Sequence, residues 1–339
     1  MDKKKVLITG GAGYIGTHTC LELIASGYEI VVIDNFSNSK EEALKRVFDI
    51  SGKKFDFYEG DVLDKEFLRD VFSKHNISSV IHFAGLKSVG ESVEKPLMYY
   101  HNNVAGTIAL CEVMSEFNVK KIVFSSSATV YGDPASVPIL ESFPLSTTNP
   151  YGRSKLIIEE ILGDLYLSDN EWSIVILRYF NPIGAHSSTR IGEDPNGIPN
   201  NIMPYITQVA IGKRDELSVF GNDYNTHDGT GVRDYIHVVD LAHGHICALE
   251  KALSTSEINY YNLGTGKGYS VLDLVKAFEE VSGVEIPYKV ISRRSGDIAE
   301  CYADTEKAFI ELGWKAQKNI VDMCRDSFNW QKNNPSGYL

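Results

Sequence analysis

The chain has 339 residues, 43% of them hydrophobic and 23% charged, which is typical of one large globular domain or two joined ones. No apolar run reaches the roughly 18 residues of a membrane span, and the formal net charge of −12 argues against nucleic acid or an anionic membrane as partner. The five cysteines are scattered without paired spacing, which predicts neither a metal site nor a disulfide framework and indicates a reducing compartment, the cytoplasm.

A glycine-rich turn follows the first predicted strand, Val6 to Thr9. The turn is a Gly-x-x-Gly-x-x-Gly sequence from Gly10 to Gly16, and a helical pattern comes after it. Glycine lets the backbone approach a pyrophosphate, and a helix N-terminus offers unpaired N–H groups. The next predicted strand ends in Asp34, about 20 residues on, where an acid binds the adenosine ribose and repels a 2′-phosphate. This spacing predicts a site for NAD; the alternative is a glycine turn without a ligand.

Strands and helices then alternate up to residue 180. Strands are expected at 30–33, 55–59, 80–83, 122–124 and 174–177, and helices at 65–75, 96–117 and 156–167. Alternation without hairpin signals predicts an α/β fold, a Rossmann-like doubly wound parallel sheet. Ligands of such sheets bind beyond the carboxyl ends of the strands. Four predicted strand ends are therefore candidates for the site: Asp34, Asp61, 83–85 and 125–127.

Tyr151 and Lys155 form a candidate catalytic pair. They stand four residues apart at the start of the 156–167 segment, so on a helix they share one face. A cation beside a phenol lowers the pKa of the phenol, which turns a group that keeps its proton to about pH 10 into a usable general base. The pattern is common, and the alternative is an aromatic residue and a lysine at a helix start.

The regular alternation ends after Phe180. The stretches 184–201 and 221–231 are rich in Gly, Pro, Asn and Ser, and shorter helices are expected at 203–211, 238–253, 271–281 and 321–330. We interpret residues 1–180 as an NAD-binding domain and 181–339 as a smaller α+β substrate domain, with the chain near 236–258 packing back on the first. Each of Arg233, Arg293 and Arg294 alone is better explained as a solvated surface charge. Together with Asn181, Asn200 and Asn201 they suit a ligand with phosphates and hydroxyls.

Several of these stretches together resemble the extended short-chain dehydrogenase/reductase family. Three segments carry this resemblance: the glycine turn, residues 125–132 and the Tyr151–Lys155 pair. Three further segments are similar in sequence to the UDP-glucose 4-epimerase family: 83–92, 178–182 and 229–237. The likeness covers essentially the whole chain. It implies a homodimer that interconverts UDP-glucose and UDP-galactose with NAD, through transient oxidation to a 4-keto sugar.

The resemblance also implies roles for individual residues. It makes Tyr151, Lys155 and Ser127 the catalytic set. It places NAD against Gly10, Gly13, Tyr14, Ile15, Gly16, Asp34, Asn35, Phe36, Ser37, Asn38, Ser39, Asp61, Val62, Phe83, Ala84, Gly85, Leu86, Lys87, Asn102, Ser127, Tyr151, Lys155 and Phe180. It places the UDP-sugar against Lys87, Ser127, Tyr151, Asn181, Asn200, Asn201, Arg233, Arg294, Asp297 and Cys301.

Cys301 bears on the substrate range that the resemblance implies. In the family, the matching position lines the wall near carbon 2 of the sugar. A tyrosine there occurs in members restricted to plain hexoses, and a smaller residue in members that also accept N-acetyl sugars, because the wall acts as a steric filter. Cys301 therefore predicts that UDP-N-acetylglucosamine and UDP-N-acetylgalactosamine are also interconverted. The alternative is that Cys301 is a small buried hydrophobic residue.

Two functions other than epimerisation are alternatives for this sequence. A nucleotide-sugar 4,6-dehydratase or decarboxylase would use the same scaffold, but the family's dehydratases carry an Asp-Glu pair after the active-site hydroxyl residue, and this chain has Ala128-Thr129. A non-catalytic NAD-binding sensor is the alternative from another class. Such proteins tend to lose the tyrosine or the lysine of the pair, and this chain has both.

Two predicted helices are more apolar than one buried face requires. They span 96–117 and 151–167, and helices that are apolar most of the way round usually bury a second face. Pairing across a two-fold axis would bury it in a homodimer. The alternative is deep burial of both helices within one subunit.

Overall fold

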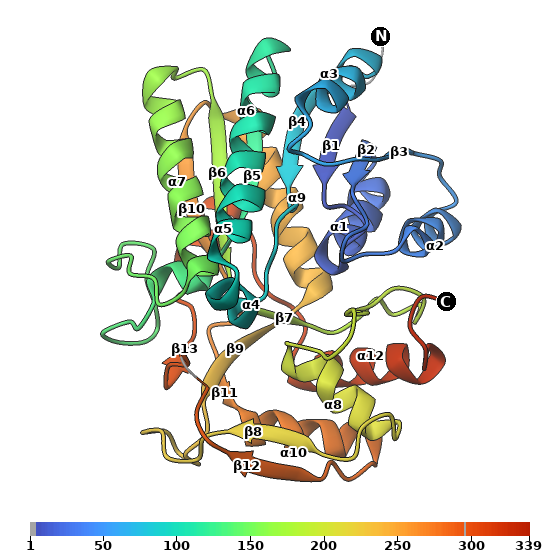
Figure 1. Cartoon of the computed structure of the whole chain (residues 1–339), viewed down its shortest axis with the longest axis vertical. Coiled ribbons are helices and arrows are strands. Elements are labelled where there is room, and N and C mark those ends of the chain that lie inside the picture. Colours follow the sequence, from blue (N-terminus) through green and yellow to red (C-terminus); the bar gives the residue numbers. More distant parts are fainter. Residues whose placement is uncertain (1–4, 295) are drawn as a thin grey trace.

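A parallel sheet of seven strands organises the computed structural model, which describes residues 5–294 and 296–339 (Figure 1). Its strand order is β10-β6-β5-β4-β1-β2-β3, and every neighbouring pair is parallel. The strands are β1 (Lys5–Thr9), β2 (Glu29–Asp34), β3 (Asp56–Glu59), β4 (Ile77–His82), β5 (Lys121–Ser127), β6 (Ser173–Tyr179) and β10 (Ile258–Leu263). The predicted doubly wound α/β fold is confirmed.

Helices cover both faces of this sheet, so its strands are apolar on both sides. Val6 and Ile8 of β1 pack on the face of α1 (Tyr14–Ala25), α2 (Glu41–Ser51) and α9 (Val238–Ser254). Leu7, between them, points to the opposite face. That face is covered by α3 (Lys65–Lys74), α6 (Gly106–Glu116) and α7 (Pro150–Ser168).

The stretch from Pro96 to Glu116 is not the uniform α-helix that we expected. It comprises α5 (Pro96–Tyr99), a π-helical segment η1 (Tyr100–Ala105) and α6, and a short helix α4 (Val89–Glu94) precedes it. A π-helical turn carries an extra residue. Apolar periodicity along the whole stretch does not reveal one such residue, so no sequence pattern predicted it.

Smaller sheets make up much of the second half, at the lower end of Figure 1. In one, β9 (Val232–His237) pairs with β7 (Asn181–Ile183), β11 (Gly268–Ser270) and β13 (Glu300–Cys301); in the other, β8 (Leu217–Phe220) pairs with β12 (Tyr288–Ile291). Helices α8 (Ile202–Ala210), α10 (Val271–Ser282) and α12 (Ile320–Asn333) share a core there, and α11 (Glu306–Leu312) packs on the sheet helix α9.

Part of the second half returns to the large sheet. Helix α9 packs against α1, β5 and β6, and β10 pairs with β6 as an edge strand.

None of the helices in the described part of the chain is both long and apolar enough to cross a membrane.

Candidate active site

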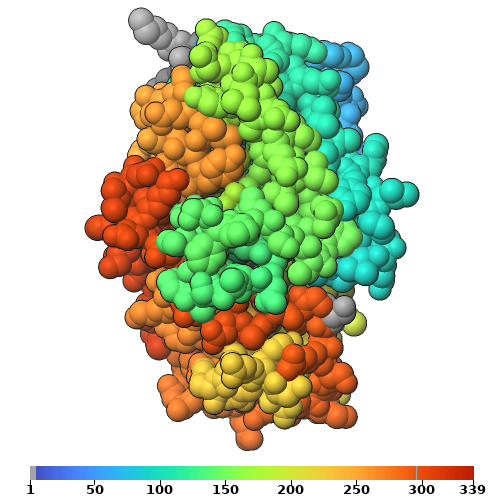
Figure 2. All heavy atoms as spheres, turned by 90° about the vertical axis from the view of Figure 1, so that its left-hand side faces the viewer, coloured from blue at the N-terminus to red at the C-terminus, as the bar shows by residue number. Residues whose placement is uncertain are grey.

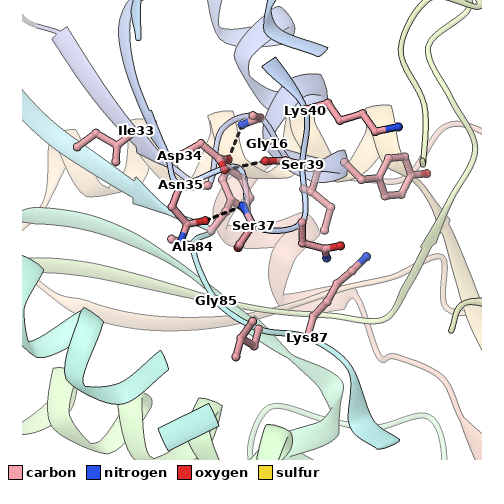
Figure 3. Close-up of a pocket in the computed structure, with 18 of the residues that line it drawn as sticks. Gly16, Ile33, Asp34, Asn35, Ser37, Ser39, Lys40, Ala84, Gly85 and Lys87 are labelled. Atoms are coloured by element: carbon pink, nitrogen blue, oxygen red, sulfur yellow. Dashed lines mark hydrogen bonds between the residues drawn. The ribbon is translucent and has the colours of Figure 1, made fainter. Parts of the chain in front are cut away.

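A cleft opens at the carboxyl ends of β1, β2, β3 and β4 (Figure 3). All the residues expected to bind the cofactor line it except three, Phe36, Ser127 and Phe180. Phe180 is instead buried in a small apolar cluster beside Cys301. The cleft runs from the glycine turn to Tyr151 and Lys155, so one surface joins the two strongest motifs of the sequence.

The glycine turn has no room for side chains at its closest approaches. Gly10 has φ +71°, and a Cβ there would lie 2.7 Å from the backbone nitrogen of Ala84. A Cβ on Gly16 would lie 2.4 Å from the carbonyl oxygen of Gly10. No side chain caps the N-terminus of α1 at Gly13, so its first N–H groups remain free for a phosphate. This bare cradle fits the pyrophosphate of a dinucleotide.

We predict that Gly16→Ala loses most of its bound NAD and also melts at a lower temperature, because the start of α1 must move away from the turn. NAD released by denaturation after gel filtration measures the first effect, and thermal unfolding the second. Gly163→Ala on α7 is the matched control, since its Cβ would meet only the Tyr260 hydroxyl at 3.9 Å. Retention of NAD by Gly16→Ala at the wild-type level would contradict the placement of the pyrophosphate.

Asp34 ties the loop after β2 to the glycine turn. Its buried carboxylate accepts hydrogen bonds from the backbone N–H groups of Ala12 and Phe36, both at 2.9 Å, and from the Ser39 hydroxyl at 2.7 Å. Figure 3 shows Asp34 and Ser39 joined in this way. A carboxylate has about four acceptor positions, so one remains for a ribose hydroxyl.

One side of the cleft comes from residues that sequence reasoning missed, 192–195 and Tyr338. Lys40 Nζ lies 2.8 Å from an Asp194 oxygen, and that carboxylate also accepts from the Tyr338 N–H at 2.9 Å. Residues 192–195 belong to a Gly- and Pro-rich stretch, and Tyr338 is next to the last residue of the sequence. Neither segment has a local sequence pattern that indicates a ligand site. Their place depends on tertiary contacts alone.

Tyr151 and Lys155 lie at the start of α7, as expected. The helix begins at Pro150, and the Asn149 side chain caps it by accepting from the Gly152 N–H at 2.8 Å. Both side chains are buried. The Tyr151 hydroxyl is hydrogen-bonded to the Ser127 side chain.

Burial dominates the ionisation of this pair. It raises the pKa of Tyr151, against the smaller opposite effect of the Ser127 hydrogen bond. It also lowers the pKa of Lys155 to about 8, against the attraction of Glu159. The Lys155 ammonium donates to the Ser125 carbonyl at 2.8 Å. The expected lowering of the Tyr151 pKa by Lys155 is therefore wrong for the chain alone, because burial raises this pKa and only the Ser127 hydrogen bond opposes it.

Asn103 is a further residue near the pair that the sequence did not reveal. Its buried side chain accepts from the Leu86 N–H at 2.7 Å and donates to the Ser154 hydroxyl at 3.0 Å. It thereby joins the loop after β4 to α7, between Tyr151 and Lys155. The π-helical segment η1 carries it.

Apart from Ser127 and Tyr151, the residues expected to bind the UDP-sugar lie in several separate places. Lys87 and Asn201 meet at the carboxylate of Glu193, at 3.3 and 2.7 Å, on the edge of the cleft; Lys40 and Lys87 extend toward the same side in Figure 3. Arg233 and Cys301 are partners on β9 and β13. The remaining positions are Asn181 and Asn200, both exposed, and Arg294 and Asp297, which form an ion pair at 3.0 Å. Ser295, in the same segment, lies outside the described residues.

Comparison with known proteins identifies close relatives. The family model GDP-mannose 4,6 dehydratase matches residues 7–327. The chain is 65% identical to UDP-glucose 4-epimerase of Bacillus subtilis (strain 168), over 98% of each chain. The structure of UDP-glucose 4-epimerase from Bifidobacterium longum in complex with NAD+ and UDP has a TM-score of 0.96 and 56% identity, covering 98% of this chain and 100% of that one. The UDP-Glc/GlcNAc 4-epimerase from Campylobacter jejuni has a TM-score of 0.84 and 37% identity, covering 97% and 99%.

Proposed function

The chain belongs to the UDP-glucose 4-epimerase family of extended short-chain dehydrogenases/reductases, and from this premise we propose how its cleft carries the reaction. It is an NAD-dependent epimerase that interconverts UDP-glucose and UDP-galactose. The observation that carries the proposed mechanism is that Tyr151 and Lys155 line one end of a cleft whose other end is the glycine turn. Ser127 lies behind them as the hydroxyl partner of Tyr151.

The residues of the chain supply position, proton transfer and electrostatics. NAD, which the glycine turn and Asp34 would hold in the cleft, would supply the hydride acceptor and donor for carbon 4 of the sugar. Tyr151, as phenolate, removes the proton of the 4-hydroxyl through its contact with Ser127, and gives the proton back when the 4-keto sugar presents its other face. Lys155 would supply a positive charge for the phenolate in the loaded cleft, against the burial that raises the pKa of Tyr151 in the chain alone. The pyrophosphate of the substrate holds the sugar in place while it turns.

Neither of the two alternatives fits the geometry as well. A dehydratase needs carboxylates after the active-site serine, and here Thr129 instead donates its hydroxyl hydrogen to Ser127 at 3.0 Å. The family model that matches this chain is named for a dehydratase. The Thr129–Ser127 contact nevertheless favours an epimerase, because Thr129 occupies the position where a dehydratase has a carboxylate. A sensor without catalysis has no need for a buried lysine beside a buried tyrosine.

The function is tested on protein purified without added NAD. Adding UDP-galactose should produce the absorbance of reduced nicotinamide together with UDP-glucose. A dehydratase would instead release a deoxy-keto sugar, and a sensor would leave UDP-galactose unchanged. Either result would overturn the proposal.

We propose that the N-acetylated UDP-sugars are substrates too. Cys301 is buried in an apolar cluster with Ala128 and Phe180, the chain neighbours of Ser127 and Asn181. A small side chain therefore lies behind two expected sugar contacts. The likeness to a structure named as a UDP-Glc/GlcNAc 4-epimerase supports this range.

We also propose a homodimer, and the cytoplasm as its compartment, which the five free cysteines support. Helix α7 lies open on the surface in Figure 2, beside the α5–α6 region. Apolar side chains stay exposed there, including Leu97 (82%), Ile108 (40%) and Leu167 (81%). Leu110 and Met114, by contrast, are buried within the subunit. These exposed side chains belong to the two helical stretches, α5–α6 and α7, which a two-fold axis can pair.

Light scattering at micromolar concentration should therefore give the mass of two chains for the wild type. Ile108→Glu should shift the protein toward monomer, because a charge would be buried without a partner. Ile310→Glu on α11 is the matched control, since Ile310 is 69% exposed and lies outside these two stretches. A monomeric wild type would rule out the dimer.

A further inference from the structure

The inward face of α7 carries a third polar residue in register with the catalytic pair. Tyr151, Lys155 and Glu159 follow one another at intervals of four residues, so they lie on one face of the helix. All three bond the last residues of β5, the first two as described above. Glu159 accepts a hydrogen bond from the Ser126 hydroxyl at 2.5 Å.

Glu159 is buried and paired with Arg178 of β6. Its side chain is 3% exposed, and one carboxylate oxygen lies 2.6 Å from Arg178 Nη2. The guanidinium Nε donates to both carboxylate oxygens at 3.1 Å. Such a bidentate pair fixes the position and orientation of the carboxylate. A fixed negative charge thus lies one helical turn beyond Lys155.

The ammonium of Lys155 needs such a charge because its surroundings are poor in anions. Burial lowers the pKa of Lys155, and Glu159 is the group that opposes this effect. The other titratable or charged groups on the described elements around α7 are Glu91, Glu94, Tyr99, Tyr100, His101, Lys121, Tyr131, Arg178 and Tyr179, with His82 and Tyr260 on neighbouring strands. Of these, Glu94 and His101 are exposed to solvent, and Lys121 is a cation.

These other groups do not replace Glu159. Burial lowers the pKa of His82 to about 3 and raises the pKa of four of the tyrosines (Tyr99, Tyr131, Tyr179 and Tyr260), so these five groups are neutral near pH 7. Glu91 is occupied with Lys95 and the Tyr99 hydroxyl. The carboxylate of Glu159 is therefore the anion within reach of the Lys155 side chain, and Arg178 holds it there.

We propose that Glu159 is a positioning residue of this active site, which supplies the counter-charge of the Lys155 ammonium and holds the end of β5 through Ser126. The inference rests on the proposed role of Lys155 in the epimerase reaction. Glu159 acts through Lys155 and Ser126 and touches neither sugar nor cofactor.

Glu159→Gln tests this, because glutamine keeps the size and loses the charge. Without the carboxylate, Lys155 loses its proton at lower pH, so the alkaline limb of the kcat profile should move down by about half a pH unit or more. The carbon chemical shift of Lys155 Cε, assigned as the signal absent from Lys155→Met, should titrate lower by a similar amount. Glu160→Gln is the matched control, since Glu160 is the next residue of α7 and is exposed; its profile should stay unchanged.

An alkaline limb and a Lys155 titration that do not move in Glu159→Gln would overturn the inference, even if the variant were less stable. Should the single variant fail to fold because Arg178 is left unpaired, Glu159→Gln/Arg178→Gln removes both charges; a downward shift is still expected, smaller because the more distant Arg178 cation is lost as well. A wild-type protein without epimerase activity would remove the proposed function instead. An active wild type with an unmoved titration would remove only the role of Glu159.

Discussion

Tyr151→Phe should abolish epimerisation almost completely while the protein keeps its NAD. Phenylalanine retains the buried ring, which is 8% exposed in the native residue, and removes only the hydroxyl that contacts Ser127 and exchanges the substrate proton. Loss of one general acid–base group costs about 10²–10⁴-fold in rate. We expect a fall of that size in kcat for UDP-galactose, with an unchanged NAD content after gel filtration.

Tyr166→Phe is the control for this prediction. Tyr166 lies on the same helix, and its hydroxyl donates to the Ser256 carbonyl at 3.5 Å, outside the cleft. That variant should turn over UDP-galactose at nearly the wild-type rate. Near-full activity of Tyr151→Phe would show that another group moves the proton.

Cys301→Tyr should remove the N-acetylated pair of substrates and spare the plain pair. The thiol lies in the apolar cluster with Ala128 and Phe180. If Cys301 forms the wall near carbon 2, as we propose, a phenol ring there takes the space of an acetamido group. A misfit of one or a few heavy atoms in a tight pocket costs about 10–200-fold in kcat/KM. We expect a loss of at least this order for UDP-N-acetylglucosamine.

The plain substrates provide the internal control, because UDP-galactose turnover by the same variant reports that it is folded. Separated products of all four UDP-sugars, for both proteins, give the comparison. Wild-type protein that is inert toward UDP-N-acetylglucosamine would refute the substrate range, and so would a variant that loses both pairs equally.

The sequence predicted the frame of the large sheet because strong local signals mark it. The apolar run from Val6 to Thr9, with glycines directly after it, is typical of a buried strand before a tight turn. Its apolar residues are buried on both faces of the sheet. The strand β10 was missed because it comes after the second half has begun, where order along the chain no longer follows order in space. The two-residue strand β13 has no period to detect.

The parts of the site formed by residues close together in the sequence could be predicted, whereas the parts that folding brings together from distant segments could not. The residue spacing within the glycine turn and within the Tyr151–Lys155 pair predicted both as site residues, and both line the cleft. Asp194 and Tyr338 reach it from distant parts of the chain and meet through a hydrogen bond that no pattern encodes. The sign of the Tyr151 pKa shift was also wrong, since spacing shows the nearby cation and says nothing about burial.

The central claim, transient oxidation at carbon 4 with return of the same hydrogen, is tested most directly by isotope retention. UDP-galactose carrying deuterium at carbon 4 is converted in ordinary water by protein to which no NAD is added. The mechanism predicts UDP-glucose that still carries the deuterium at carbon 4, because the hydride never leaves the cleft. Deuterium lost to solvent, or a product that has lost water from the sugar, would contradict it.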